Sequence, residues 1–141
     1  MAEGVELIQR FYRELLGDGN LDAIDELVTD DVVEHEQGLP GQPEGKEGVV
    51  FFVNTLRGAF SDIEATVGQS LESGDLACGH VTITGRHTGE WMGVPPSDRS
   101  FEIQSIDIIR IEDGKCAEHW GVTDNIALMM QIGAIPEPAQ A

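Results

Sequence analysis

The sequence predicts an α+β domain in which helices cover one face of a curved, mainly antiparallel sheet. Apolar residues in the N-terminal half recur at helical spacings, and later segments show the alternation or the β-branched content of strands. An Asp-Gly pair separates the last two strand-like segments and indicates a hairpin. A chain that forms helices first and strands afterwards builds a domain of this class.

Three N-terminal helices are predicted from apolar residues spaced three and four positions apart, at 5–16, 21–28 and 46–60. The first ends at a Gly-Asp-Gly-Asn run. A brief strand at 30–35 is expected to lead into a Gly/Pro-rich loop over 37–45.

Four strands are predicted in the C-terminal half, at 63–71, 76–87, 101–111 and 115–122. A turn at Asp113-Gly114 predicts that the last two strands are antiparallel neighbours. A terminal helix is expected over 124–132, with Asp124 as its cap and Gly133 as its end. We therefore predict one domain over 1–135 and a loose tail over 136–141.

Composition restricts the classes of function. The chain has 141 residues with 40% hydrophobic content, enough for a core without metal or disulfide support. Its 26 acidic and 8 basic residues give a formal net charge of -18, which opposes binding to nucleic acid or anionic membranes. A solvated acidic surface is the simplest interpretation of this charge.

The two cysteines, Cys78 and Cys116, lie far apart and fit neither a disulfide framework nor a zinc pattern. We expect two buried thiols. The N-terminus has no basic segment followed by an apolar run, and no apolar run is long enough to span a bilayer. The sequence thus suggests a cytoplasmic protein.

Asp107 is the first candidate for chemistry. Strand periodicity places it on the same face as Ile103, Ile109 and Ile111, which is the face turned toward the core. A carboxylate there must be paired or must have a raised proton affinity, and either condition suits a general acid or base. The alternative is a structural carboxylate held by a backbone amide or a hydroxyl.

The hairpin register decides which residue faces Asp107. A two-residue Asp-Gly turn places Trp120 opposite, whereas a three-residue loop with Gly114 in a left-handed bulge places His119 opposite. The bulged loop separates polar from apolar residues better, so we expect a cross-strand Asp107/His119 pair. An imidazole oriented by a carboxylate can shuttle a proton near neutral pH.

Other side chains are expected near the pocket. His87 shares the inward parity of Val81 and precedes a loop in which Trp91 serves either as a lid over the pocket or as a plug of the core. His35 ends the short strand, from which it reaches the pocket mouth. His80 has the opposite parity and is assigned a structural or interfacial role.

The four histidines lack the spacings of metal ligands, so no metal site is predicted. Nucleotide-binding loops and the Gly-x-Ser-x-Gly elbow of serine hydrolases are also absent from the sequence. Acid/base chemistry without a cofactor is the class of reaction that remains.

An ordered set of motifs along the chain resembles the SnoaL-like ester cyclase family, also called SnoaL-like polyketide cyclases. The set comprises Ala59-Phe60-Ser61-Asp62-Ile63, Gly85-Arg86-His87-Thr88-Gly89-Glu90, Gly93-Val94-Pro95-Pro96, Ile106-Asp107-Ile108-Ile109-Arg110-Ile111, Asp113-Gly114-Lys115 and Glu118-His119-Trp120-Gly121-Val122-Thr123-Asp124. With the N-terminal helices it covers nearly the whole chain. The resemblance is specific for the family but not for the substrate.

The resemblance implies the cone of the nuclear transport factor two-like superfamily, with a deep apolar pocket, no cofactor and homodimers packed sheet to sheet. It also implies an aspartate that acts as acid and base in the intramolecular aldol closure of a polyketide ester. Asp107 and Asp124 both lie in matching motifs, and we assign the role to Asp107 with His119, because Asp124 is expected to cap a helix. His35, His87, Trp91, Trp120 and Asp124 are assigned to the substrate pocket.

The functional hypothesis is a cofactor-independent acid/base enzyme that closes a ring in a small apolar or polyketide-like carbonyl compound. Two alternatives stay open, because one fold supports many functions. The first is an epoxide hydrolase or dehydratase that uses the same pocket. The second is a non-catalytic module for small-ligand binding or dimerisation.

Overall fold

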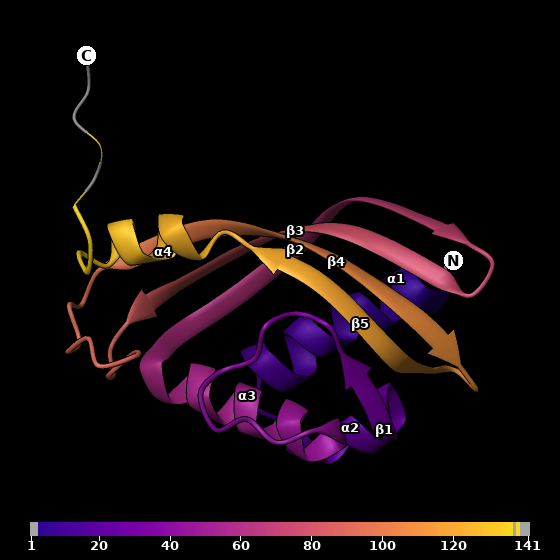
Figure 1. Cartoon of the computed structure of the whole chain (residues 1–141). Helices are drawn as coiled ribbons and strands as arrows, with labels where there is room; N and C mark the ends of the chain where they lie inside the picture. The colour runs from indigo at the N-terminus through magenta and orange to yellow at the C-terminus, as the bar shows by residue number, and fades with distance from the viewer. Residues whose placement is uncertain (1–2, 137, 139–141) are drawn as a thin grey trace.

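The computed structural model describes residues 3–136 and 138 and shows a curved, unclosed five-stranded sheet over N-terminal helices (Figure 1). The strand order is β1-β5-β4-β3-β2. Neighbouring strands are antiparallel except β1 and β5, which are parallel. The predicted α+β class and the curved, mainly antiparallel sheet are confirmed.

The helices and strands follow in the order α1 (Glu3–Arg10), the π-helix η1 (Phe11–Gly17), the 3-10 turn η2 (Leu21–Ala23), α2 (Ile24–Leu27), β1 (Val28–Glu34), α3 (Gly45–Ala59), β2 (Phe60–Ser73), β3 (Leu76–His87), β4 (Ser100–Glu112), β5 (Lys115–Thr123) and α4 (Asn125–Gln131).

The helix predicted over 5–16 is one helical run in which α1 passes directly into η1. The apolar face continues through the change in hydrogen bonding, because Ile8, Tyr12 and Leu15 are all buried. π-Helical turns are rare in proteins, and those that do occur often lie at functional sites. Here the π-helix carries Tyr12, whose hydroxyl reaches the sheet.

Strand β4 confirms the predicted alternation. Its odd positions from 101 to 109 are buried and its even positions from 102 to 108 are exposed. Asp107 is 4% exposed, on the face that packs toward the helices. The inward orientation of this carboxylate is therefore set by the pleat of a regular strand.

The predicted hairpin register was wrong. Asp113 and Gly114 both have positive φ, 51° and 77°, and form a two-residue turn with Glu112 paired to Lys115. The ladder then shifts by one residue between Ile111 and Arg110, because a β-bulge lies within β5 rather than in the loop. As a result Asp107 faces Gly121.

Two consecutive valines in β1 lie on opposite sides of the sheet. Val32 is buried, whereas Val33 is 47% exposed. The alternation of a strand therefore places Glu34 on the inner side and His35 on the outer side. This parity corrects the expectation that His35 reaches the pocket mouth.

The remaining expectations concern the cysteines, the membrane and the tail. Cys116 is buried as expected, but Cys78 is only half-buried. Within residues 3–136 and 138, no helix combines the length and the apolar character needed to cross a bilayer. Most of the tail predicted over 136–141 falls outside the described residues.

Candidate active site

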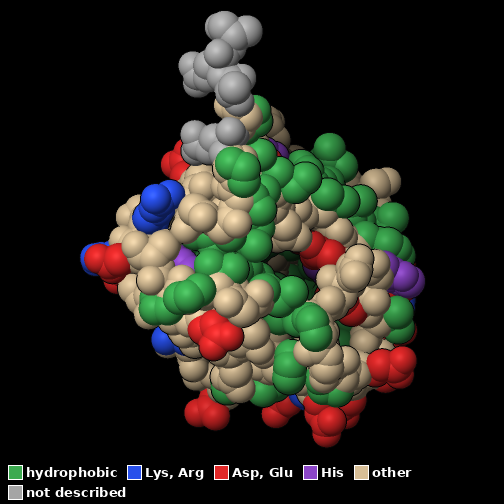
Figure 2. Space-filling model, turned by 60° about the vertical axis from the view of Figure 1, so that its left-hand side comes forward, with side chains coloured by type: hydrophobic (Ala, Val, Ile, Leu, Met, Phe, Trp, Pro, Cys, Tyr) green, Lys and Arg blue, Asp and Glu red, His purple; other side chains and the backbone are tan. Residues whose placement is uncertain are grey.

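A cavity of about 470 Å³ lies between the inner face of the sheet and the N-terminal helices. Apolar side chains from both layers line much of it, among them Phe11, Leu16, Phe52, Leu56, Trp91 and Met129. Figure 2 shows a face of the molecule on which apolar side chains surround a small hollow, with acidic side chains beside it. A cavity of this size and character suits a small, mostly apolar molecule.

Asp107 contributes a buried carboxylate to the cavity wall and accepts three hydrogen bonds. The Tyr12 hydroxyl donates to Oδ2 at 2.5 Å, and the Ser105 hydroxyl donates to the same oxygen at 3.4 Å. The His119 imidazole donates from Nε2 to Oδ1 at 2.8 Å. A carboxyl group that is held by three donors in an apolar wall is positioned to act as a base.

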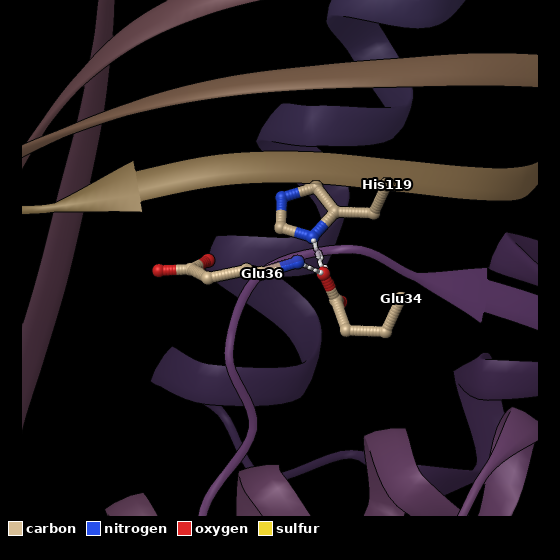
Figure 3. Close-up of side chains that lie close together, drawn as sticks. All are labelled: Glu34, Glu36 and His119. Carbon is tan, nitrogen blue, oxygen red and sulfur yellow. Dashed lines mark hydrogen bonds and ion pairs between the residues drawn. The ribbon is translucent and has the colours of Figure 1, made fainter.

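His119 lies between the carboxylates of Glu34 and Asp107, and Figure 3 shows its contact with Glu34. Its Nδ1 is 2.7 Å and 2.8 Å from the two carboxylate oxygens of Glu34, and its Nε2 contacts Asp107. Burial lowers the pKa of His119, but the hydrogen bonds to Asp107 and Glu34 outweigh burial and raise it to about 10. The ring is therefore an imidazolium at neutral pH.

Tyr12 is the second donor that faces Asp107. Burial and the negative charge of Asp107 hold the pKa of the Tyr12 hydroxyl well above its ordinary value. The hydroxyl therefore stays protonated and remains a hydrogen-bond donor. The predicted Asp107/His119 pair is thus present, and it belongs to a larger group with Tyr12 and Glu34.

Glu36 lies beyond the end of β1 and also lines the cavity. The Thr123 hydroxyl donates to its Oε2 at 3.0 Å. A Cβ built on Gly121 would stand 2.7 Å from Glu36 Oε1 and 2.9 Å from Asp107 Oδ1. Because Gly121 has no side chain, the carboxyl groups of Glu36 and Asp107 can both lie against this position.

Glu34, Glu36 and His119 present donor atoms within 4.8 Å of one another, which is a spacing compatible with a metal ion. A histidine ligand needs a free ring lone pair. Both ring nitrogens of His119 instead contact carboxylates. The geometry is therefore that of an ion-paired imidazolium, and the absence of a cofactor remains a prediction.

His87 and Trp91 differ in their relation to the cavity. Trp91 lines the cavity and packs against Phe60, with ring centroids 5.2 Å apart. It is buried, so it plugs this end of the core, while Met92 beside it is exposed. His87 is fully buried, is not among the residues that line the cavity, and accepts from the Ser97 backbone N–H at Nδ1.

Four of the residues assigned to the pocket, His87 among them, do not line the cavity. His35 and Trp120 stack on each other on the outer side of the sheet, with ring centroids 4.8 Å apart. The bulge in β5 puts Trp120 opposite Ile108, an outward-facing residue. Asp124 is exposed and caps α4 by accepting from the Ala127 N–H at 3.0 Å.

Four site residues were missed by the sequence reasoning, namely Tyr12, Glu34, Glu36 and Gly121. Tyr12 was counted only as one more residue on an apolar helix face, although a hydroxyl there needs a partner. By the alternation of a strand, Glu34 and Glu36 lie on the same face as Val32. Because Val33 is equally apolar, the sequence did not indicate which of the two faces is buried. Gly121 carried no signal, because the bulge that positions it was not predicted.

Comparison with known proteins identifies the family of this chain. Residues 6–132 match the family described as SnoaL-like polyketide cyclase. The aklanonic acid methyl ester cyclase DauD of Streptomyces sp. (strain C5) is 32% identical over 94% of this chain and 83% of its own length. The nogalonic acid methyl ester cyclase of Streptomyces nogalater is 29% identical over 82% of this chain and 87% of its own.

Solved structures show the same fold. TsrD from Streptomyces laurentii superposes with a TM-score of 0.84 at 28% identity, over 94% of this chain and 96% of that one. IdmH from Streptomyces antibioticus superposes with a TM-score of 0.79 at 31% identity, over 94% of this chain and 99% of that one. The chain belongs to the SnoaL-like polyketide cyclase family and is an enzyme of the SnoaL-like cyclase type.

Proposed function

We propose that this chain closes a ring in a polyketide ester by an intramolecular aldol reaction, with Asp107 as the acid/base group. The observation that carries the proposal is the carboxylate of Asp107, 4% exposed and held by three donors in the wall of an apolar cavity. The relatives named for methyl ester cyclisation supply the substrate class, a polyketide methyl ester.

The reaction begins when the Asp107 carboxylate takes a proton from the acidic carbon between two carbonyl groups. The resulting enolate attacks a second carbonyl carbon of the same molecule, so a C–H bond breaks and a C–C bond forms. The new alkoxide oxygen takes up a proton, and the product is an isomer of the substrate. No oxidant, reductant or other co-reactant is required.

The protein contributes shape and charge to these steps. The cavity brings the two reacting carbons of one molecule together, and proximity of this kind removes a large part of the barrier. The imidazolium of His119 and the Tyr12 hydroxyl surround Asp107 with positive charge and a donor. Both contacts hold the Asp107 side chain in position at the cavity wall.

Asp107→Asn tests the proposal, with Asp124→Asn as the matched control. Asparagine at 107 keeps the size of the side chain but removes the base, so kcat for cyclisation of aklanonic or nogalonic acid methyl ester should fall about 10²- to 10⁴-fold. The control variant still caps α4, since asparagine and aspartate are comparable caps, and should leave kcat near that of the unchanged protein.

Other outcomes would contradict the proposal. If the Asp107→Asn variant retains the kcat of the unchanged protein, Asp107 is not the acid/base group. Hydrolysis of limonene-type epoxides without any cyclisation of these esters would indicate the epoxide hydrolase alternative. Binding of the esters without turnover by the unchanged protein would indicate a binding module.

We also propose that the chain forms a homodimer through the outer face of the sheet. Ile106 and Val122 are cross-strand partners on this face, and they are 43% and 76% exposed. Ile108, two positions along β4, extends the apolar patch. Contiguous exposed apolar surface of this kind marks interaction sites.

Sedimentation velocity tests the dimer. Val122→Glu places a charge in the middle of the patch and should convert a dimer to a monomer. Ile135→Glu changes an exposed apolar residue beyond α4 and should leave the dimer intact. A monomer in the unchanged protein at micromolar concentration would refute the proposal.

A further inference from the structure

We propose that Glu36 is the general acid of this enzyme, the group that delivers a proton to the alkoxide formed in ring closure while Asp107 serves as the base. The inference rests on the proposed cyclisation and assigns its second proton transfer to a separate residue. It starts from the position of Glu36, whose carboxyl group lines the cavity beside Asp107.

One oxygen of the Glu36 carboxyl group accepts a hydrogen bond, and the other faces the backbone of Gly121. Thr123 donates to Oε2 at 3.0 Å, whereas Oε1 lies 2.7 Å from the point where a Cβ on Gly121 would stand. Asp107 Oδ1 lies 2.9 Å from the same point. Figure 3 shows the Glu36 carboxyl group directed away from the Glu34 carboxylate, with which it makes no contact there.

The other groups around Asp107 are engaged in roles that leave them poor proton donors. Both ring nitrogens of His119 contact carboxylates, which stabilise the imidazolium against loss of a proton. The Tyr12 hydroxyl is committed to Asp107 Oδ2, and the Glu34 carboxylate is committed to His119 Nδ1. The Glu36 carboxyl group also lines the cavity, but its hydrogen-bond donor is Thr123 rather than His119 or Tyr12.

A negative charge near a carboxyl group raises the proton affinity of that group. Asp107 is the one that accepts donors from Tyr12 and His119. Burial raises the pKa of Glu36, the charges of Asp107 and Glu34 raise it further, and Thr123 and His119 act against them. Glu36 is therefore the carboxyl group whose raised pKa favours holding a proton at this position.

The proton balance closes within the site. Asp107 takes the proton of the broken C–H bond, and Glu36 gives its own proton to the alkoxide oxygen as the C–C bond forms. The proton on Asp107 then passes to the Glu36 carboxylate across the space beside Gly121. The resting state of both groups is restored without any outside donor.

Glu36→Gln separates the two proton transfers. Glutamine keeps the size of the side chain and an oxygen that accepts from Thr123, but it has no acidic proton. Exchange of the acidic C–H of aklanonic acid methyl ester with solvent deuterium, followed by NMR, reports the base step. Ring closure reports both steps.

Glu36→Gln should keep the deuterium exchange near that of the unchanged protein and should lower kcat for ring closure about 10²-fold. Asp107→Asn should lose both activities. Glu47→Gln, an exposed residue of α3, is the control and should change neither. If Asp107→Asn keeps the exchange, the proposed base fails, and this outcome is distinct from a failure of Glu36.

Two results would overturn the assignment of Glu36. The first is a Glu36→Gln variant that keeps ring closure or loses exchange and closure to the same extent. The second needs no turnover: ¹³C NMR of the side-chain carboxyl groups identifies Glu36 by the signal that Glu36→Gln removes. Titration of that signal at or below the ordinary pH range of glutamate would refute the general acid on its own.

Discussion

The chemistry of this site depends on how individual charged groups are paired. His119 donates to carboxylates from both ring nitrogens, so its positive charge is stabilised from both sides of the ring. Asp107 in turn is buried and accepts hydrogen bonds from His119, Tyr12 and Ser105. The proposed base is therefore a carboxyl group beside an imidazolium rather than beside a neutral imidazole.

The raised pKa of His119 predicts how stability depends on pH. The folded protein holds the His119 proton up to about pH 10, whereas the unfolded chain releases it near pH 6.5. The stabilisation is therefore complete below about pH 6.5 and is lost as the pH rises toward 10, with a slope of at most about -1.4 kcal/mol per pH unit.

Urea unfolding at several pH values between about 7 and about 9.5 checks this expectation, since the window lies between the two pKa values of His119. The free energy of unfolding should fall more steeply with pH in the unchanged protein than in His119→Gln, which has no group to titrate at this position. ¹⁵N NMR of the ring should show both nitrogens protonated at about pH 8. Equal slopes in the two proteins would contradict the imidazolium.

At the scale of elements, two irregularities position the site. The π-helix η1 carries Tyr12, whose hydroxyl reaches β4, and the bulge in β5 places Gly121 rather than His119 opposite Asp107. Despite that shift, His119 stays on the inner face two residue pairs away, opposite Ile109, and still reaches Asp107. The two-residue turn at Asp113-Gly114 sets the start of this register.

Gly114→Ala should destabilise the protein, because Gly114 has a φ of 77° and an L-residue in this conformation costs about 1–2 kcal/mol. Gly58→Ala is the matched control. Gly58 is exposed in α3 with open space around its Cα, so alanine there should stabilise the protein by up to about 1 kcal/mol. Thermal or urea unfolding of both variants measures the difference.

A stability of Gly114→Ala equal to or above that of the unchanged protein would contradict the two-residue turn. The two-residue turn also requires Glu112 to pair with Lys115. Cross-strand nuclear Overhauser effects between those two residues test the pairing directly.

At the scale of the whole molecule, charge is the dominant feature. A net charge of -18 on 141 residues produces self-repulsion in the compact state. Added salt screens this repulsion, since the Debye length falls from about 30 Å at ~0.01 M to about 8 Å at ~0.15 M ionic strength. The isolated surface ion pairs contribute little against it.

We therefore expect Tm to rise when NaCl is increased from about 0.01 M to about 0.15 M. Scanning calorimetry in a weak buffer measures the shift, and a parallel series in KCl separates general screening from binding of one ion. A Tm that stays constant or falls with salt would show that attractive pairs outweigh the net repulsion.

The alternation of β4 made the inward orientation of Asp107 predictable, and helical spacing located the N-terminal helices, since both periods are local properties of the backbone. The hairpin at Asp113-Gly114 was also predicted, but with a three-residue loop where the structure has a two-residue turn. The register beyond the turn was not predictable, because a bulge is selected by the packing of side chains from several elements rather than by the residues beside it.

Local patterns in the chain were enough to establish the fold class, the inner face of β4 and the candidacy of Asp107 and His119, because each depends on periods of a few residues. The groups that surround these two residues became known only from the folded molecule. Tyr12, Glu34 and Glu36 lie far from Asp107 along the chain, and the curvature of the sheet over the helices brings their side chains to it. Contacts between distant segments depend on packing, which no local pattern records.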